Sequence, residues 1–505
     1  MSDGSALARK RSVDAGVGGA KMRRIGEGTF ARIYLCRHGA DAGRAIKVFR
    51  REPGVGVSSD AVREVLLLDL VGPHEALVRK IRWDWKMVGA DDAPAAGGVH
   101  AVWIYMPFAP NTLRDLILHT PTVERREWAS DAHRQLWQGA LRHLHAHGVA
   151  HRDIKPANIL VYFEPGRDGA TRRRLSLADF GNACLVTRDA HTGEAKKMCE
   201  VWTTYEYAAP EVLACDESCS STRRYYDPFA GDAWSLGVVL GEICHREHVV
   251  DWKGAPKKGD AAGYLHRLCS EGTRECLARA LPPAWKDLVA WCPEDRPVAT
   301  PTAPSAPTAS SAPTAPSATS APSAPSAPSA TSAPSAPSAT SAPSATSATS
   351  ATSATSATPT WRIISGAREA ILHGGLPPTE WPCPRWRLNV RTFLDKLSRE
   401  QQLDEPEDGV DMALTILDQH LELEQQQGRS CSREDLPSLS LAALMLANKL
   451  LCHAQVSDWE ERIAKNAGNS PWYGWASVEK AERMLFERIA GRGLCVGLPE
   501  TRGDS

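Results

Sequence analysis

Three side chains suited to phosphoryl transfer lie within one short stretch, His151-Arg152-Asp153-Ile154-Lys155-Pro156-Ala157-Asn158. The carboxylate of Asp153 can orient a hydroxyl nucleophile, the ammonium of Lys155 can neutralise phosphate charge, and the amide oxygen of Asn158 can bind a cation. Three further motifs follow in the sequence: Asp179-Phe180-Gly181, Ala209-Pro210-Glu211 and Asp232-Ala233-Trp234-Ser235-Leu236-Gly237. Chance recurrence of the whole series in this order is negligible, and the series indicates phosphoryl chemistry.

A glycine-rich segment precedes this stretch, in Ile25-Gly26-Glu27-Gly28-Thr29-Phe30-Ala31-Arg32-Ile33. Because glycine has no side chain, the backbone amides of such a segment can approach and bind phosphates. Lys47 lies on the next expected strand, in Ala45-Ile46-Lys47, at a distance suited to a phosphate-binding lysine. Alone, these residues would indicate only a tight hairpin and a solvated lysine. The motifs that follow favour the phosphate-binding interpretation.

The elements that must position these residues fall into two halves. In the first half, alternating apolar residues predict strands over 24–35 and 44–50, and helical spacing predicts helices over 62–70 and 134–145. In the second half, four amphipathic helices are expected over 389–397, 410–423, 439–451 and 478–489. The pattern predicts an α+β domain followed by an all-helical domain.

A low-complexity tract separates the two halves. Residues 299–360 are drawn only from Pro, Ser, Ala and Thr, with no charge and no large apolar side chain. Such a tract cannot bury a core, and its frequent proline favours extended segments, so we expect a disordered spacer. Residues 1–22, with the basic cluster Arg9-Lys10-Arg11, are expected to be either a disordered tail or a nuclear-import patch.

The composition excludes several classes of protein. Among 505 residues, 59 Lys and Arg balance 60 Asp and Glu, so no bulk field favours nucleic acid or an anionic membrane. The 13 cysteines include no C-x-x-C pair, which argues against a zinc knuckle or a disulfide framework. No apolar run approaches the roughly 18 residues of a membrane helix. We expect an intracellular protein, in the nucleus, the cytoplasm or both, with no direct nucleic-acid or membrane partner.

Residues 23–298 resemble a eukaryotic protein kinase, and every signature element of that family is present. The resemblance implies a two-lobed α+β fold, ATP and Mg²⁺ as cofactors, and protein hydroxyls as substrates. It implies that Lys47 contacts the α- and β-phosphates and pairs with Glu64. Asp153 would be the catalytic base, and Lys155, typical of serine/threonine kinases, would neutralise the transferred phosphoryl. Asn158 and Asp179 would hold Mg²⁺.

The same resemblance implies a set of nucleotide-binding residues. They are Ile25, Gly26, Gly28, Ala31, Ile33, Ala45 and Lys47, with Met106 as the gatekeeper and Ala109 in an adenine-binding hinge over 107–109. Ile33 and Ala45 would pack on the adenine. Ala31 replaces the third loop glycine with another small residue.

The helix expected after Lys47 makes the resemblance more specific, because it points to one subgroup of protein kinases. Ser58-Ser59-Asp60-Ala61-Val62-Arg63-Glu64 is similar to the PSTAIRE-type helix of cyclin-dependent kinases, which a cyclin holds in that family. In that family three arginines grip a phosphothreonine of the activation segment. Arg63 and Arg152 match two of them, but Cys184 occupies the third position. Cys199 occupies the position of the phosphothreonine, so we expect Glu200 to replace the phosphate by pairing with Arg152 and Arg63.

Two further positions of this half depart from the cyclin-dependent pattern. Thr204 matches the substrate-side threonine. Ala208 replaces the arginine of the proline-directed subgroup, so a preference for Ser-Pro or Thr-Pro substrates stays open. The arginine that pairs with Glu211 could be Arg296 or Arg362. Residues 361–374 resemble the last kinase helix, so the spacer is expected to interrupt the end of the kinase lobe.

Residues 383–500 resemble a single cyclin box. The similar segments are 387–394, 413–421, 441–449 and 478–489, followed by Gly497-Leu498-Pro499. The resemblance implies that Lys449 and Glu482 bond the backbone before the PSTAIRE-like helix, and that Arg387 and Asp418 brace the helices. An ordinary helical bundle with four surface charges is the alternative.

Together these features predict a serine/threonine kinase activated in cis by its own cyclin-like domain. Two alternatives remain at this point. One is a pseudokinase scaffold, although Lys47, Asp153, Asn158 and Asp179 are all retained. The other is a kinase that carries an unrelated helical interaction domain.

Overall fold

A computed structural model describes most of the two predicted domains. The described residues are 14–17, 20–28, 31–50, 56–88, 99–121, 124–125, 129–166, 171–188, 192, 194–216, 225–244, 263–264, 268, 386–400, 406–429, 431–432, 434–451 and 475–492. The described residues all belong to one compact unit, which spans 1–300 and 360–505. The predicted spacer, the helix expected over 361–374, Arg296 and Arg362 lie outside the described residues.

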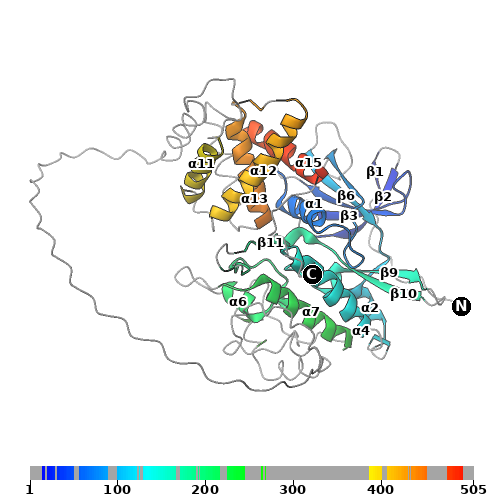
Figure 1. Cartoon of the computed structure of the whole chain (residues 1–505). Coiled ribbons are helices and arrows are strands. Elements are labelled where there is room, and N and C mark those ends of the chain that lie inside the picture. Colours follow the sequence, from blue (N-terminus) through cyan, green and yellow to red (C-terminus); the bar gives the residue numbers. More distant parts are fainter. Residues whose placement is uncertain are drawn as a thin grey trace, which may run out of the picture. The chain divides into compact units, whose positions relative to one another are not determined.

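The first lobe is built on an antiparallel sheet (Figure 1, upper right). Its strands are β1 (Asp14–Val17), β2 (Ala20–Glu27), β3 (Ala31–Cys36), β4 (Arg44–Arg50), β5 (Arg82–Val88) and β6 (Val99–Pro107), in the order β1-β2-β3-β4-β6-β5. The strands expected over 24–35 and 44–50 are thereby confirmed, with a turn inside the first. Residues 14–17 and 20–22, within the segment expected to be a tail, pair as strands. Met22 is buried beside Tyr34 and Ile46, and this burial favours the strand.

The pleat of β4 sorts its side chains onto two faces. Ile46 and Val48 pack on one face with Trp103 and Tyr105 of β6. Ala45 and Phe49 belong to the main core on the other face, which also holds the apolar side of α1 (Ser59–Val71). Lys47 alternates with Ile46 and Val48, so it lies on the face that α1 covers.

The second lobe is mainly helical and carries the catalytic motifs on its connecting segments. Its helices are α2 (Leu113–His119), α4 (Ala129–His133), α5 (Arg142–Ala146), α6 (Pro210–Asp216) and α7 (Pro228–Cys244). The predicted helix over 134–145 is present as a π-helical stretch, Arg134–Leu141, continued by α5. Two small antiparallel sheets flank the catalytic segments. One contains β7 (Asn111–Thr112), β9 (Ile159–Pro165) and β10 (Thr171–Leu177), and the other contains β8 (Val149–Ala150) and β11 (Cys184–Leu185).

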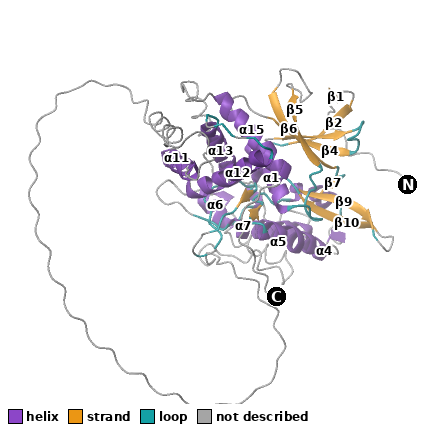
Figure 2. Ribbon diagram, turned by 45° about the horizontal axis from the view of Figure 1, so that its top comes forward, coloured by secondary structure: helices purple, strands orange, loops and turns teal. Residues whose placement is uncertain are grey.

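The predicted all-helical segment is confirmed. Its described helices are α11 (Trp386–Glu400), α12 (Pro406–Gln426), α13 (Leu436–Leu451) and α15 (Trp475–Arg492). Every residue of α13 is buried, because this helix packs against α11, α12 and α15 and also against α1 of the first lobe (Figure 1, Figure 2). Among the described helices, none combines the length and apolar character needed to cross a membrane.

Candidate active site

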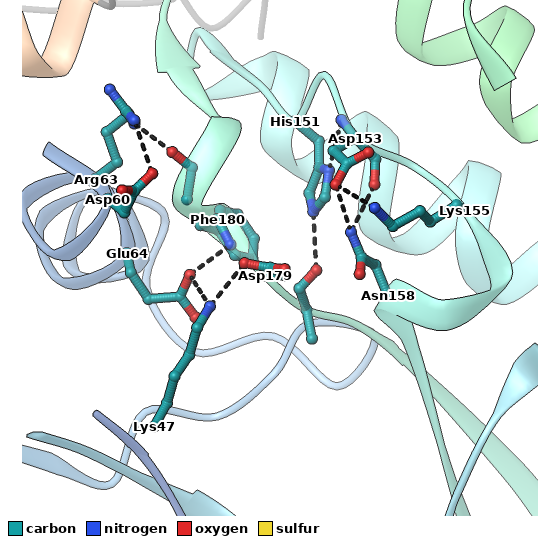
Figure 3. Close-up of polar contacts among 12 residues, drawn as sticks. Lys47, Asp60, Arg63, Glu64, His151, Asp153, Lys155, Asn158, Asp179 and Phe180 are labelled. Carbon is teal, nitrogen blue, oxygen red and sulfur yellow. Dashed lines mark hydrogen bonds and ion pairs between the residues drawn. The ribbon is translucent and has the colours of Figure 1, made fainter. Parts of the chain in front are cut away.

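Three elements bring charged side chains together beside the sheet. Lys47 comes from β4, Glu64 from α1, and Asp179 from the segment after β10 (Figure 3). Lys47 Nζ lies 3.1 Å from Glu64 Oε2 and 2.7 Å from Asp179 Oδ1. The Glu64 carboxylate also accepts a hydrogen bond from the N–H of Phe180 at 2.5 Å. The position of α1 therefore determines whether Lys47 has its glutamate partner.

The electrostatics of this cluster keep Lys47 and Asp179 charged. Burial disfavours the Lys47 ammonium, but the nearby carboxylates of Asp179 and Glu64 outweigh it and raise the pKa of Lys47. The positive charge of Lys47 in turn lowers the pKa of Asp179 to about 2. Asp179 is therefore an ionised carboxylate at neutral pH.

The second cluster is centred on Asp153. Its Oδ2 accepts hydrogen bonds from Lys155 Nζ at 2.8 Å and from Asn158 Nδ2 at 3.0 Å. Its Oδ1 accepts from the hydroxyl of Thr204 at 2.7 Å, and the same hydroxyl accepts from Lys155 at 2.8 Å. Asp153 and Lys155 therefore hold an alcohol oxygen between a carboxylate and an ammonium.

Asp232, on α7, holds the backbone of the catalytic segment. Its buried carboxylate accepts from the N–H of His151 at 2.8 Å and from the N–H of Arg152 at 2.7 Å, and it lies 3.0 Å from His145 Nε2. The sequence prediction noted the motif that starts at Asp232 but gave this residue no role. The contact spans 81 residues of sequence, so only the folded chain reveals it.

Backbone strain is located beside both clusters. Arg152 has φ 62° and Asp179 has φ 71°, in the left-handed region that non-glycine residues rarely adopt. Such residues cost on the order of 1–3 kcal/mol each and persist where the surrounding contacts fix them. Here Asp232 holds the N–H of Arg152 and Lys47 holds the side chain of Asp179.

The residues predicted to bind the nucleotide lie on adjoining strands. Ile33 on β3 pairs in register with Lys47, and Ala45 pairs with Met106 at the end of β6. The N–H of Gly28 bonds the carbonyl of Ala31 at 2.9 Å, which closes the glycine-rich turn. The other predicted members lie on β2, in Ile25 and Gly26, and just after β6, in Ala109. The prediction omitted Ile104, which lies directly opposite Lys47.

The donor set beside Asp153 fits Mg²⁺. Asp179 offers an ionised carboxylate whose side chain is 46% exposed. Asn158 uses its amide nitrogen on Asp153, which directs its amide oxygen elsewhere. Hard oxygen ligands of this kind suit Mg²⁺, which usually takes only one or two protein ligands besides phosphate and water. The described part of the chain has no cluster of three or more His, Cys, Asp or Glu residues suited to a metal.

The predicted activation-segment arginines bind backbone groups. Arg63 donates to the carbonyl of Gly181, to Asp60 Oδ1 at 3.0 Å and to the carbonyl of Lys449 at 3.3 Å. Arg152 donates to the carbonyl of Asn182 at 2.8 Å and lies 4.0 Å from the sulfur of Met198.

Other contacts anchor the rest of this segment. The N–H and carbonyl of Met198 bond the backbone of Tyr226, whose hydroxyl donates to the carbonyl of Glu200 at 2.7 Å. The pairing of the Glu200 carboxylate with the two arginines stays a prediction. Glu211 lies at the start of α6, and both of its predicted arginine partners lie outside the described residues.

The C-terminal helices contact the peptide that precedes α1. Lys449 Nζ donates to the carbonyl of Val57 at 2.7 Å, and Glu482 Oε2 accepts from the N–H of Val57 at 2.9 Å. The two side chains also pair with each other at 2.6 Å and are fully buried. By contrast, Arg387 and Asp418 form a largely exposed pair at 3.0 Å.

Two features of this contact were missed from the sequence. A Cβ on Gly56 would lie 1.9 Å from Glu482 Oε2, so any larger residue would force the Glu482 carboxylate to move. Trp83 and Trp85, on one face of β5, place their rings 5.0 and 5.8 Å from that of Phe486 on α15. The nearby Arg483 lies 2.9 Å from His100 of β6. An aromatic contact therefore joins α15 to the first lobe.

Comparison with known proteins matches residues 20–308 to the protein kinase domain. CBL-interacting protein kinase 4 of Oryza sativa subsp. japonica is 30% identical over 52% of this chain and 52% of that protein. A CTD kinase subunit alpha homolog of Encephalitozoon cuniculi is 30% identical over 48% of this chain and 61% of its own length. Cyclin-dependent kinase E-1 of Arabidopsis thaliana is 28% identical over 44% of this chain and 43% of that protein. The chain thus spans about half the length of these relatives.

Proposed function

The chain belongs to the protein kinase family, and we propose that it is a serine/threonine kinase that transfers the γ-phosphoryl of ATP to protein hydroxyls. The observation that carries this proposal is the position of the Thr204 hydroxyl, 2.7 Å from Asp153 and 2.8 Å from Lys155. A substrate hydroxyl in the same relation to these side chains would be oriented by the carboxylate and would have an ammonium beside the transferred phosphoryl.

Each side chain of the site has a distinct task in this reaction. Bound Mg-ATP would supply the phosphoryl group and neutralise its charge, with Asp179 and Asn158 as the metal ligands. Lys47, fixed by Glu64, would hold the phosphates at the level of β4. Asp153 would accept the hydroxyl proton as the oxygen attacks, and Lys155 would stabilise the developing negative charge. Asp232 would keep the backbone of the Asp153 segment in its strained conformation.

We further propose that the C-terminal helices act as a cyclin-like domain on α1 of the same chain. Support comes from Lys449 and Glu482, which hold both polar groups of the Val57 peptide two residues before α1. Arg63, one residue before Glu64, reaches the end of α13 through the Lys449 carbonyl. These contacts would fix α1 in the position where Glu64 meets Lys47.

A kinase assay on the purified full chain, without an added activator, tests the catalytic proposal. The substrate is a degenerate peptide array with Ser, Thr or Tyr as the only acceptor, and radiolabelled ATP is the donor. We expect transfer to Ser and Thr but not to Tyr. Asp153→Asn should lower kcat by about a hundredfold or more while leaving ATP binding nearly unchanged, since it removes general-base chemistry but no phosphate contact. A wild-type chain that binds ATP but transfers nothing would identify a pseudokinase.

A further inference from the structure

The loop that follows β11 is closed by its own backbone and by one residue of the helical segment. The N–H of Lys196 bonds the carbonyl of Thr187 at 2.9 Å, and Arg188 pairs with Ala195 as a short antiparallel bridge. This pairing places the side chains of Thr187 and Lys196 next to each other. Both belong to the activation segment, between the Asp179 motif and Glu211.

Asp408, in the first turn of α12, binds both side chains. The hydroxyl of Thr187 donates to Asp408 Oδ2 at 2.5 Å, and Lys196 Nζ lies 2.7 Å from Asp408 Oδ1. The side chain of Asp408 is 16% exposed and that of Lys196 is 30% exposed, so solvent screens this ion pair only in part. We call Thr187, Lys196 and Asp408 the loop clamp.

The loop clamp is continuous with the anchors of the catalytic segment. Two residues after Lys196, Met198 contacts the sulfur of Cys184 at 3.4 Å and bonds the backbone of Tyr226. In the resemblance to cyclin-dependent kinases, Cys184 and Cys199 occupy the positions of the third arginine and of the phosphothreonine. A carboxylate from the helical segment instead provides negative charge to the activation segment.

We propose that Asp408 is a positioning residue that holds the activation segment through the loop clamp, so that the order of this segment depends on the docked helices and not on a phosphate. The inference rests on the proposed kinase function and specifies its regulation. Its physical basis is that the Asp408 carboxylate binds the hydroxyl of Thr187 on one arm of the loop and the ammonium of Lys196 on the paired arm. Without it, Lys196 would lose a charged partner and the loop would open.

Four variants of the full chain test the loop clamp. Asp408→Ala removes both contacts, and Thr187→Glu places a second negative charge against Asp408. Glu407→Gln is the matched control, because Glu407 is an exposed carboxylate one residue earlier in α12. The charge exchange Asp408→Lys with Lys196→Asp should restore an ion pair in reversed order.

Hydrogen exchange of a peptide that covers residues 184–198 provides a readout that does not depend on activity. We expect Asp408→Ala and Thr187→Glu to speed exchange roughly tenfold, as for the loss of a hydrogen bond to a charged group. Glu407→Gln should match wild type, and the charge exchange should recover part of the loss. Three results would overturn the proposal. They are a hydrogen-exchange rate in Asp408→Ala equal to that of wild type, an equal increase in that rate in Glu407→Gln, and no recovery of the rate in Asp408→Lys with Lys196→Asp.

Steady-state kinetics separate this role from general stability. Asp408→Ala should lower kcat/KM for the peptide about tenfold while the KM for ATP changes less than about twofold, because Lys47 and Glu64 stay in place. An equal rise in the KM for ATP would mean that Asp408 supports the whole fold and not the loop. If the wild-type chain transfers no phosphoryl, the kinase proposal fails, whereas the exchange measurement still decides whether the clamp exists.

Discussion

Lys449 and Glu482 form an ion pair at 2.6 Å with no solvent exposure, and each also bonds one polar group of the Val57 peptide. Burial of two charges is costly unless they are paired and hydrogen-bonded. The Val57 peptide supplies those additional bonds. The geometry is directional: an ammonium faces a carbonyl, and a carboxylate faces an N–H.

Exchange of the two charges tests this direction. In Lys449→Glu with Glu482→Lys the ion pair persists, but the carboxylate meets the Val57 carbonyl and the ammonium meets its N–H. We expect kcat/KM to fall roughly tenfold or more, because a hydrogen bond to a charged group contributes about 1.5–3 kcal/mol. The same exchange at the exposed Arg387 and Asp418 pair should change activity less than about twofold, as surface pairs contribute little. Equal effects at both pairs would show that orientation at Val57 is unimportant.

Gly56→Ala should damage the same contact from the other side. The new Cβ would overlap Glu482 Oε2, so the carboxylate must move off the Val57 N–H. We expect a loss of activity close to that of Glu482→Ala alone, and almost no additional loss when the two changes are combined. Additive losses in this double-mutant cycle would mean that Gly56 acts through its own backbone.

Lys47→Met should raise the KM for ATP and also lower kcat, since Lys47 contacts the phosphates in both the ground state and the transition state. Asp153→Asn should lower kcat alone. Steady-state titration of ATP against both variants measures the difference. An unchanged KM for ATP in Lys47→Met would remove Lys47 from the nucleotide site.

The helical segment should lose stability in mild acid. Burial, together with the charge of Arg488, lowers the pKa of His420 from 6.5 to about 4. Between these values the unfolded chain binds a proton that the folded chain excludes, so stability falls as the pH drops. The neighbouring Glu424, held by Arg429 and Arg488, has a pKa lowered to about 2 and does not titrate in this window.

Thermal unfolding of the full chain at about pH 7.5 and about pH 5 measures this effect. The expected loss is on the order of 2 kcal/mol, from about 1.4 kcal/mol per unit of pKa shift. His420→Gln, which stays neutral, should show a smaller decrease in Tm between the two pH values. A decrease as large as that of wild type would assign the pH dependence to other groups.

The sequence located the chemistry but not the contacts between distant segments. Asp153, Lys155 and Asn158 lie within eight residues, so their proximity in the structure follows from local backbone geometry. The pairing of Lys47 with Glu64 was implied by the resemblance to protein kinases, and the structure places the two side chains 3.1 Å apart. The helical character of 386–400, 406–426, 436–451 and 475–492 followed from apolar periodicity.

Residues whose roles depend on distant partners could not be found in this way. The close approach at Gly56 involves Glu482, and Asp408 accepts from the hydroxyl of Thr187, 221 residues earlier. Nothing in the sequence links Trp83 and Trp85 to Phe486, whose ring the structure places against both. Periodicity identifies the face of an element that is buried, but not the element that covers it.

If the helical segment activates the kinase on the same chain, activity per molecule should not depend on the enzyme concentration. Specific activity of the purified full chain over a roughly hundredfold dilution tests this most directly, because an intramolecular partner keeps its effective concentration when the protein is diluted. We expect constant activity per molecule over the whole range for wild type, and a lower but equally constant value for Lys449→Glu with Glu482→Lys. A steep fall in wild-type activity on dilution would mean that the activating partner is another chain, and an unchanged rate in the exchanged variant would mean that these helices do not control α1.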